Sequence, residues 1–188
     1  MEKHIPTYEE AKQLFLKYNQ TESLINHGKA VEAVMRYIAR KLNEDEEKWG
    51  IIGLVHDLDY EKYPEQHCKI TKQILEEAGW DDSYIRAIMS HAWEICTDVQ
   101  PEHIMEKYLY AIDELTGLVT ACALVRPSKS VMDMEVSSVK KKWKQKSFAA
   151  GANREVILKG AEMLNITLDE LIQDVIDGMK TIAKDIGL

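Results

Sequence analysis

The sequence predicts an all-α protein, folded as a bundle of eight or nine helices. Nine glycines and four prolines among 188 residues amount to about 7 %, where about 12 % is ordinary, and this argues against a turn-rich β-sandwich or a disordered chain. Apolar residues recur at spacings of three and four along nearly the whole chain, which is the pattern of amphipathic helices. No segment alternates convincingly with period two, so no strand is expected.

The expected helices follow from local signals taken in chain order. Leu14, Phe15 and Tyr18 define the first apolar face, and Val31 begins a longer one on the second helix. Gly79 marks the end of the fourth helix and Pro101 the start of the sixth. Pro127 lies in the break after the sixth, and Thr167 with Glu170 forms a capping box for the last. The predicted helices span 7–18, 22–42, 44–58, 65–78, 82–92, 102–125, 136–148, 153–164 and 168–185.

Length and composition favour one domain over residues 1–188. With 45 % apolar and 30 % charged residues, the chain can bury an adequate core without a disulfide or a structural metal. Its three cysteines, Cys68, Cys96 and Cys122, show no CxxC spacing, and we interpret them as small buried hydrophobic residues in a reducing compartment. No signal peptide and no apolar run of membrane-spanning length is visible. We therefore expect a soluble, cytoplasmic protein without a membrane partner.

Charge is unevenly distributed. The net charge of −8 disfavours stable binding to a nucleic-acid backbone, because that affinity comes from lysine and arginine releasing counterions. Residues 126–159, however, have a net charge of +6, which leaves −14 for the remainder. The sequence thus predicts one basic region on an acidic body.

Several buried-looking polar residues suggest a metal site. His56 and Asp57 end an apolar helix, and adjacent helical side chains converge only on a point near the helix end. Alternatively, His56 is a satisfied core histidine and Asp57 merely stops the helix. Asp113 lies in a helix that is apolar around most of its circumference, without Lys or Arg three or four positions away. A buried carboxylate there requires a partner cation or a metal.

Further histidines complete an ordered series, His27, His56–Asp57, His67, His91 and Asp113, on five predicted helices. In this order the sequence resembles the HD-domain superfamily of metal-dependent phosphohydrolases, over roughly residues 20–126, with 127–188 as a helical extension. The resemblance implies that His27, His56, Asp57 and Asp113 bind one metal. It also implies that Asp57 bridges to a second metal held by His67 and His91. His4 and His103 do not fit the series and are expected at the surface.

Imidazole and carboxylate ligands suit one or two divalent Fe, Mn, Zn, Co or Ni ions better than a calcium site. Two such ions about 3.5 to 4 Å apart would hold and activate a hydroxide for attack on phosphorus. The expected activity is hydrolysis of a small phosphate ester, in the phosphomonoesterase or phosphodiesterase class. A nucleotide substrate is compatible with this expectation. A cyclic dinucleotide is disfavoured, because no Gly-Tyr-Pro element is present.

Other residues have predicted supporting roles. Asp59 and Glu61 are candidate catalytic residues beside Asp57, as proton carriers or as partners of the metal ligands, although solvated loop acids are the alternative. Glu94 is a weaker candidate to support His91. Four basic residues are expected to bind the substrate phosphate, unless the lysine run is only a solvated helix face; they are Arg126, Lys142, Lys146 and Arg154.

Two other functions remain open. Some HD-type proteins with the additional histidines are mixed-valent dinuclear iron oxygenases, and a third interpretation is a non-catalytic module that binds metal or nucleotide. The several apolar helix faces are also compatible with a homodimer.

Overall fold

The computed structural model describes residues 3–188 and confirms the all-α prediction. Within that range the chain forms nine α-helices and two short 3-10 helices, with no β-strand and two isolated bridges, His4–Trp80 and Trp93–Thr97. The helices are α1 (Tyr8–Tyr18), α2 (Glu22–Leu42), α3 (Glu46–Val55), η1 (Pro64–Gln66), α4 (Lys69–Glu77), α5 (Asp82–Ser90), α6 (Ile104–Leu124), α7 (Val136–Trp143), α8 (Arg154–Leu164), α9 (Leu168–Lys180) and η2 (Ala183–Ile186).

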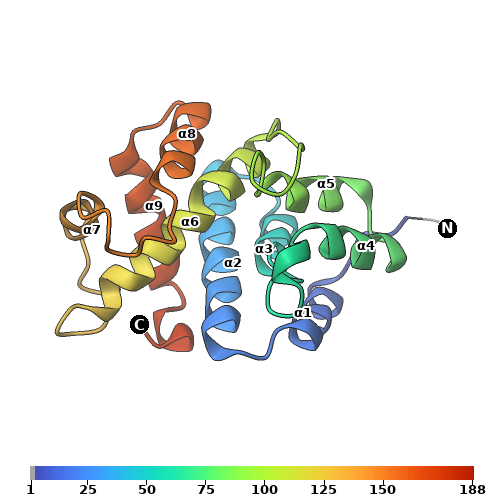
Figure 1. The fold of residues 1–188 in the computed structure, drawn as a ribbon, viewed down its shortest axis with the longest axis horizontal. Helices are drawn as coiled ribbons and strands as arrows, with labels where there is room; N and C mark the ends of the chain where they lie inside the picture. The colour runs from blue at the N-terminus through green and yellow to red at the C-terminus, as the bar shows by residue number, and fades with distance from the viewer. Residues whose placement is uncertain (1–2) are drawn as a thin grey trace.

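Helices α2 and α6 lie at the centre of the molecule, and the other helices pack on their two sides (Figure 1). α3 packs against α2 and is buried over its whole length from Trp49 to Val55. α4 and α5 lie on the same side as α3, whereas α8 and α9 cover α6 and α2 from the other side. The C-terminal third of the chain therefore packs onto the helices that bear the predicted ligands.

Close backbone contact joins the C-terminal helices to this centre. A Cβ on Gly160 of α8 would lie 2.4 Å from Cβ of Ala111 on α6. A Cβ on Gly178 of α9 would likewise lie 2.7 Å from Cα of Val34 on α2. Because real Cβ contacts are never that short, these two glycines allow the helix pairs to approach as closely as they do.

Local capping explains several helix starts. The predicted Thr167–Glu170 capping box is present at the start of α9. His103, predicted to be a surface histidine, is exposed and has a further role: its Nδ1 accepts the backbone N–H of Met105 at 3.1 Å, capping α6. Asp45 caps α3 by accepting the N–H of Lys48.

Several predicted helices are too long at their ends. The helix predicted over 44–58 ends at Val55, and the chain turns through residues 56–63. The segment predicted as one helix over 65–78 is divided into η1 and α4, because Cys68 between them adopts φ 67°, outside the helical region. The helices predicted over 136–148 and 168–185 end at Trp143 and Lys180.

No helix among residues 3–188 is both long and apolar enough to cross a membrane. The prediction that the cysteines are buried is correct for Cys68 and Cys122 and wrong for Cys96, which is exposed. Cys96 lies in the irregular segment after α5, where the chain turns back through residues 91–97.

Candidate metal centre

The first histidine comes from the N-terminal part of α2. His27 Nε2 lies 2.9 Å from Oδ1 of Asp113, which α6 presents from the opposite side. The same nitrogen lies 3.7 Å from Oδ2 of Asp57. Because α2 and α6 pack against each other, two residues 86 positions apart in the chain meet at one point.

His56 and Asp57 follow directly after the buried helix α3. The His56 side chain is completely buried, and its Nδ1–H donates to the backbone oxygen of Gly53 at 2.7 Å. Its Nε2 lies 3.2 Å from Asp113 Oδ1 and 3.3 Å from Asp57 Oδ2. Because they follow the end of α3, His56 and Asp57 lie at the point that His27 and Asp113 also face.

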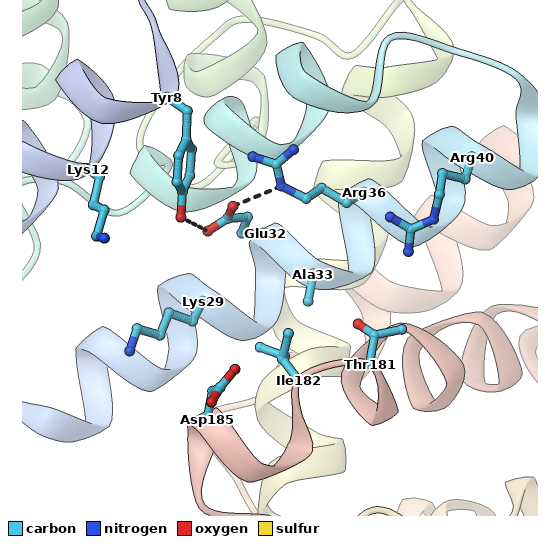
Figure 2. A pocket seen from close by; sticks show the side chains of 10 residues that line it. All are labelled: Tyr8, Lys12, Lys29, Glu32, Ala33, Arg36, Arg40, Thr181, Ile182 and Asp185. Atoms are coloured by element: carbon cyan, nitrogen blue, oxygen red, sulfur yellow. Dashed lines mark hydrogen bonds and ion pairs between the residues drawn. The ribbon is translucent and has the colours of Figure 1, made fainter.

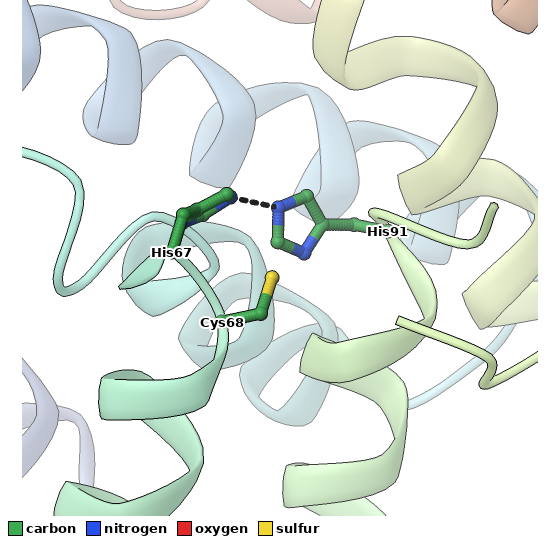
Figure 3. A group of neighbouring side chains, drawn as sticks. All are labelled: His67, Cys68 and His91. Atoms are coloured by element: carbon green, nitrogen blue, oxygen red, sulfur yellow. Dashed lines mark hydrogen bonds between the residues drawn. The ribbon is translucent and has the colours of Figure 1, made fainter. Parts of the chain in front are cut away.

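A second pair of histidines faces the other oxygen of Asp57. Nε2 of His67 and Nε2 of His91 each lie 3.4 Å from Asp57 Oδ1. The two nitrogens lie 3.2 Å from each other, and the dashed line in Figure 3 marks this contact. Nδ1 of His91 is bound to the backbone oxygen of Ile88 at 2.5 Å, and Nδ1 of His67 to the carboxylate of Asp59 at 2.8 Å.

The donor set fits a metal. The partners of Nδ1 in His56, His67 and His91 are all acceptors, so each Nδ1 must hold a proton. In the neutral ring Nε2 is then an acceptor too, and these nitrogens face one another and carboxylate oxygens, which are also acceptors. The repulsion among these acceptor atoms is relieved only when the cluster binds cations, which are either protons or metal ions. The geometry separates two groups. The first consists of His27, His56, Asp57 and Asp113. The second consists of His67 and His91, which face Asp57 Oδ1.

The charges of the cluster reflect this arrangement. Burial by itself would lower the pKa of His56, but the nearby carboxylates of Asp57 and Asp113 outweigh it and hold this pKa well above its usual range. Burial would raise the pKa of both carboxyls, yet the histidines around them depress it. The cluster therefore strongly attracts positive charge.

The cluster opens into a cavity of about 530 Å³. The residues that line this cavity come from distant parts of the chain. α2 provides Leu24, and the loop after α7 provides Ala149, Gly151 and Ala152. Five of the six predicted ligands line it, and they are His27, Asp57, His67, His91 and Asp113. His56 lies behind them in the core.

The other two predicted catalytic residues occupy different surroundings. Asp59 is fully buried, which rules out the solvated-loop alternative for it; one oxygen accepts Nδ1–H of His67 and the other accepts the backbone N–H of Thr71 at 2.7 Å. Glu61 is half-buried and accepts the backbone N–H groups of Gln20 and Thr21, before the start of α2. Asp59 thus orients His67, a predicted metal ligand, whereas Glu61 holds the residues that precede α2 and His27.

The four predicted phosphate-binding residues are not part of the cavity wall. Arg126 pairs with Asp133, and Lys142 lies over the ring of Phe148. The Arg154 guanidinium donates to backbone oxygens of Phe148, Ala149 and Ala152. Lys146 is exposed. Arg154 consequently acts on the cavity indirectly, by holding the loop that forms one of its walls.

Sequence reasoning missed Glu114, which lines the cavity next to Asp113. Its Oε2 accepts the backbone N–H of Asn153 at 3.2 Å, linking α6 to the wall-forming loop. Burial raises the pKa of Glu114, and the neighbouring Asp113 raises it further. The signal was present, because Glu114 is an acidic residue directly beside Asp113 in the same apolar helix. Glu94, weighed as a support for His91, instead pairs with Lys159.

Cys68 is a buried residue beside the second histidine pair. Figure 3 shows its thiol pointing toward the ring of His91, beside the pair. Burial raises the pKa of this thiol far above its usual range, so it is present as the neutral thiol. Its positive φ turns the chain between His67 and α4.

A separate cavity of about 460 Å³ lies on the outer face of α2 (Figure 2). Glu32 lines it and accepts Nε–H of Arg36 at 2.8 Å and the hydroxyl of Tyr8 at 3.4 Å. This network joins α1 to α2 and contains none of the histidines, so it has a structural explanation.

The comparison with protein families matches residues 24–118, slightly more than half of the chain, to the HD domain. Comparisons with curated proteins and with solved structures gave no significant match. All six predicted ligands lie within the matched range. The chain belongs to the HD domain family.

Proposed function

We propose that this protein is a metal-dependent phosphohydrolase that acts on a small phosphate ester at the Asp57 cluster. One observation carries the proposal: the two oxygens of Asp57 face two different groups of imidazole nitrogens. Oδ2 lies 3.3 Å from His56 Nε2, and Oδ1 lies 3.4 Å from both His67 Nε2 and His91 Nε2. Such a divided carboxylate suits two adjacent cations.

His27, His56, Asp57 and Asp113 would hold one ion, and Asp57, His67 and His91 the other. The mixture of nitrogen and oxygen donors favours divalent Fe, Mn, Zn, Co or Ni over calcium. When bound, such ions would supply Lewis acidity toward a phosphoryl oxygen and lower the pKa of a coordinated water.

The chain's own residues contribute preorganisation. Backbone oxygens of Gly53 and Ile88 hold His56 and His91 in place, and Asp59 holds His67. These contacts fix which ring nitrogen faces Asp57, as is usual for histidine ligands of metals. Tyr60 stands edge-on to His67 with their ring centroids 5.3 Å apart and lines the cavity mouth. A phosphate ester entering there would meet ligands that need no rearrangement.

The phosphate-binding role of Arg126, Lys142, Lys146 and Arg154 forms part of the proposal in modified form. Arg154 supports Ala149 and Ala152, which line the cavity, through its backbone contacts. We propose that it shapes the phosphate site by holding this loop, and that the lysines contribute through their positive charge.

The test is a panel of phosphomonoesters, phosphodiesters and nucleotides, assayed with protein loaded separately with Mn, Co, Ni, Fe or Zn. We expect release of inorganic phosphate or a monoester in at least one combination, and none from Asp57→Asn under the same conditions. Absence of turnover on every phosphate compound, with metal content verified by elemental analysis, would contradict the proposal.

The same preparations test the two alternatives. Oxygen consumption that occurs only with iron would indicate an oxygenase. Tight nucleotide binding without hydrolysis in any metal form would indicate a binding module.

A further inference from the structure

We infer that the substrate extends from the metal centre past Gly117 into an adjoining cavity, which takes a bulky alcohol group bearing no second anionic group. This inference rests on the proposed function, since it concerns the part of the ester away from the phosphate. The adjoining cavity has a volume of about 510 Å³ and lies between the start of α2, α6 and the segment after α9.

The two cavities share part of their walls. His27 and Gly117 line both of them. His27 is a predicted metal ligand, and Gly117 follows Asp113 by four residues on α6, so both lie beside the metal cluster. A molecule with its phosphate at Asp57 and Asp113 therefore reaches the second cavity by passing along the surface of Gly117.

Gly117 has no packing reason to be glycine. It lies in the interior of α6, where glycine is less favourable than alanine. A Cβ at this position would meet no atom within 4 Å, in contrast to Gly160, where it would lie 2.4 Å from Ala111. The absent side chain leaves free space at the point where the two cavities meet.

The second cavity has polar and apolar sides. Ser23 and Asn26 on α2 and Thr120 on α6 supply hydroxyl and amide groups, whereas Leu124 and Ile186 are apolar. Thr116, one turn before Thr120, donates its hydroxyl to the backbone oxygen of Ile112 in the core. This lining suits a ring-bearing or alkyl group with a few polar atoms.

The charge of the lining limits the occupant further. Glu22 is an acidic side chain at its edge, and no lysine or arginine is among the residues that line it within the described part of the chain. A second phosphate or a carboxylate in this cavity would face Glu22 without a compensating cation. The chemistry therefore favours a neutral or cationic alcohol group over one with a second anion.

The test compares three aryl phosphates: phenyl phosphate, 4-biphenylyl phosphate and 4′-carboxy-4-biphenylyl phosphate. In wild type we expect kcat/KM to be higher for the biphenylyl ester than for its carboxylated analogue. Gly117→Leu should lower kcat/KM for the biphenylyl ester by about tenfold or more, because it fills the connection. The loss for phenyl phosphate, which does not reach the second cavity, should be smaller, so the ratio of kcat/KM for the biphenylyl ester to kcat/KM for phenyl phosphate should fall.

Two further variants act as controls. Ala121→Leu adds the same side chain to α6 at a position outside both cavity walls. It should leave the ratio of kcat/KM for biphenylyl phosphate to kcat/KM for phenyl phosphate unchanged. Glu22→Gln should reduce the discrimination against the carboxylated ester. Gly117→Ala, which adds only a methyl group, provides a folded variant should the leucine variant not fold.

Equal losses on phenyl and biphenylyl esters in Gly117→Leu, or no loss on either, would overturn the inference while leaving the proposed function intact. If metal-loaded wild type hydrolyses none of these esters and no compound of the broader phosphate panel, the proposed function fails. The cavity is then tested by calorimetric binding of biphenylyl phosphate, which Gly117→Leu should weaken and Ala121→Leu should not.

Discussion

Asp59 Oδ1 lies 2.8 Å from Nδ1 of His67, and this contact determines that Nε2 of the histidine faces Asp57. Asp59 is itself held by the backbone N–H of Thr71. The pKa of Asp59 is lowered, because the contacts with His67 and Thr71 outweigh the effect of burial. Asp59 is therefore an ionised positioning residue for His67, a proposed metal ligand.

Replacing this carboxylate should selectively weaken one of the two proposed metal sites. We expect Asp59→Asn to lower affinity for the ion at His67 and His91 by about 10- to 100-fold, the usual effect of losing such a support. The ion at His27, His56 and Asp113 should be retained. Metal titration by calorimetry would show two sites in wild type and one strong site in the variant; loss of both together would contradict the separate roles.

Asp57 should contribute more to metal binding than any single histidine. Because its two oxygens face both groups, Asp57→Ala should remove more metal than His67→Ala, which affects one group only. Elemental analysis of the purified variants measures this directly. Unchanged metal content in Asp57→Ala would refute the assignment of the bridging ligand.

Metal removal should destabilise the protein, because the ligands come from distant segments and the site does not exist in the unfolded chain. At a free metal concentration about 100 times Kd, binding adds about 2.7 kcal/mol to the free energy of unfolding. The midpoint of thermal unfolding should be lowest with chelator and should rise as the concentration of Mn or Zn increases. Asp57→Ala is the matched control, and its midpoint should respond far less.

Two glycine-to-alanine variants should have opposite effects on stability. Gly160→Ala should cost about 1 to 3 kcal/mol, because the new methyl would collide with Ala111. Gly117→Ala should stabilise the protein by about 0.5 to 1 kcal/mol, because the space is free and alanine favours the helix. Urea unfolding at one pH measures both; a stable Gly160→Ala variant would show that α8 can shift away from α6.

Glu61 should contribute stability that depends on pH. The backbone N–H groups of Thr21 and Gln20 donate to its carboxylate and lower its pKa in the folded state. The ionised group therefore stabilises the fold above its ordinary pKa, and this contribution is lost as the pH falls through the folded-state pKa. Unfolding experiments from pH 7 to pH 3 should show a difference between wild type and Glu61→Gln that shrinks at the acidic end.

The same variant tests the catalytic role predicted for Glu61. If its role is to hold residues 20–21 before α2, Glu61→Gln should retain most of the phosphatase activity at pH 7. A loss of activity with unchanged stability would instead support the catalytic prediction.

The sequence was sufficient for the class of fold and for identifying the histidines and aspartates that the structure brings together in one cluster. Apolar spacing identified the helices, since a helix buries one face whatever its neighbours are. Asp113 was recognisable because a carboxylate in an apolar helix needs a cation. Helix ends were less predictable: the break at His67 and Cys68 depends on a positive φ that local propensity does not indicate.

Only the tertiary structure decided how these residues work together. The division of Asp57 between two histidine groups, the support of His67 by Asp59 and the place of Glu114 in the cavity wall all depend on how separate helices pack. The basic residues of 126–159 show the same dependence, because Arg154 turns toward the backbone of its own loop. A sequence by itself determines which side chains need a partner, whereas the packing of distant helices determines which partner each one meets.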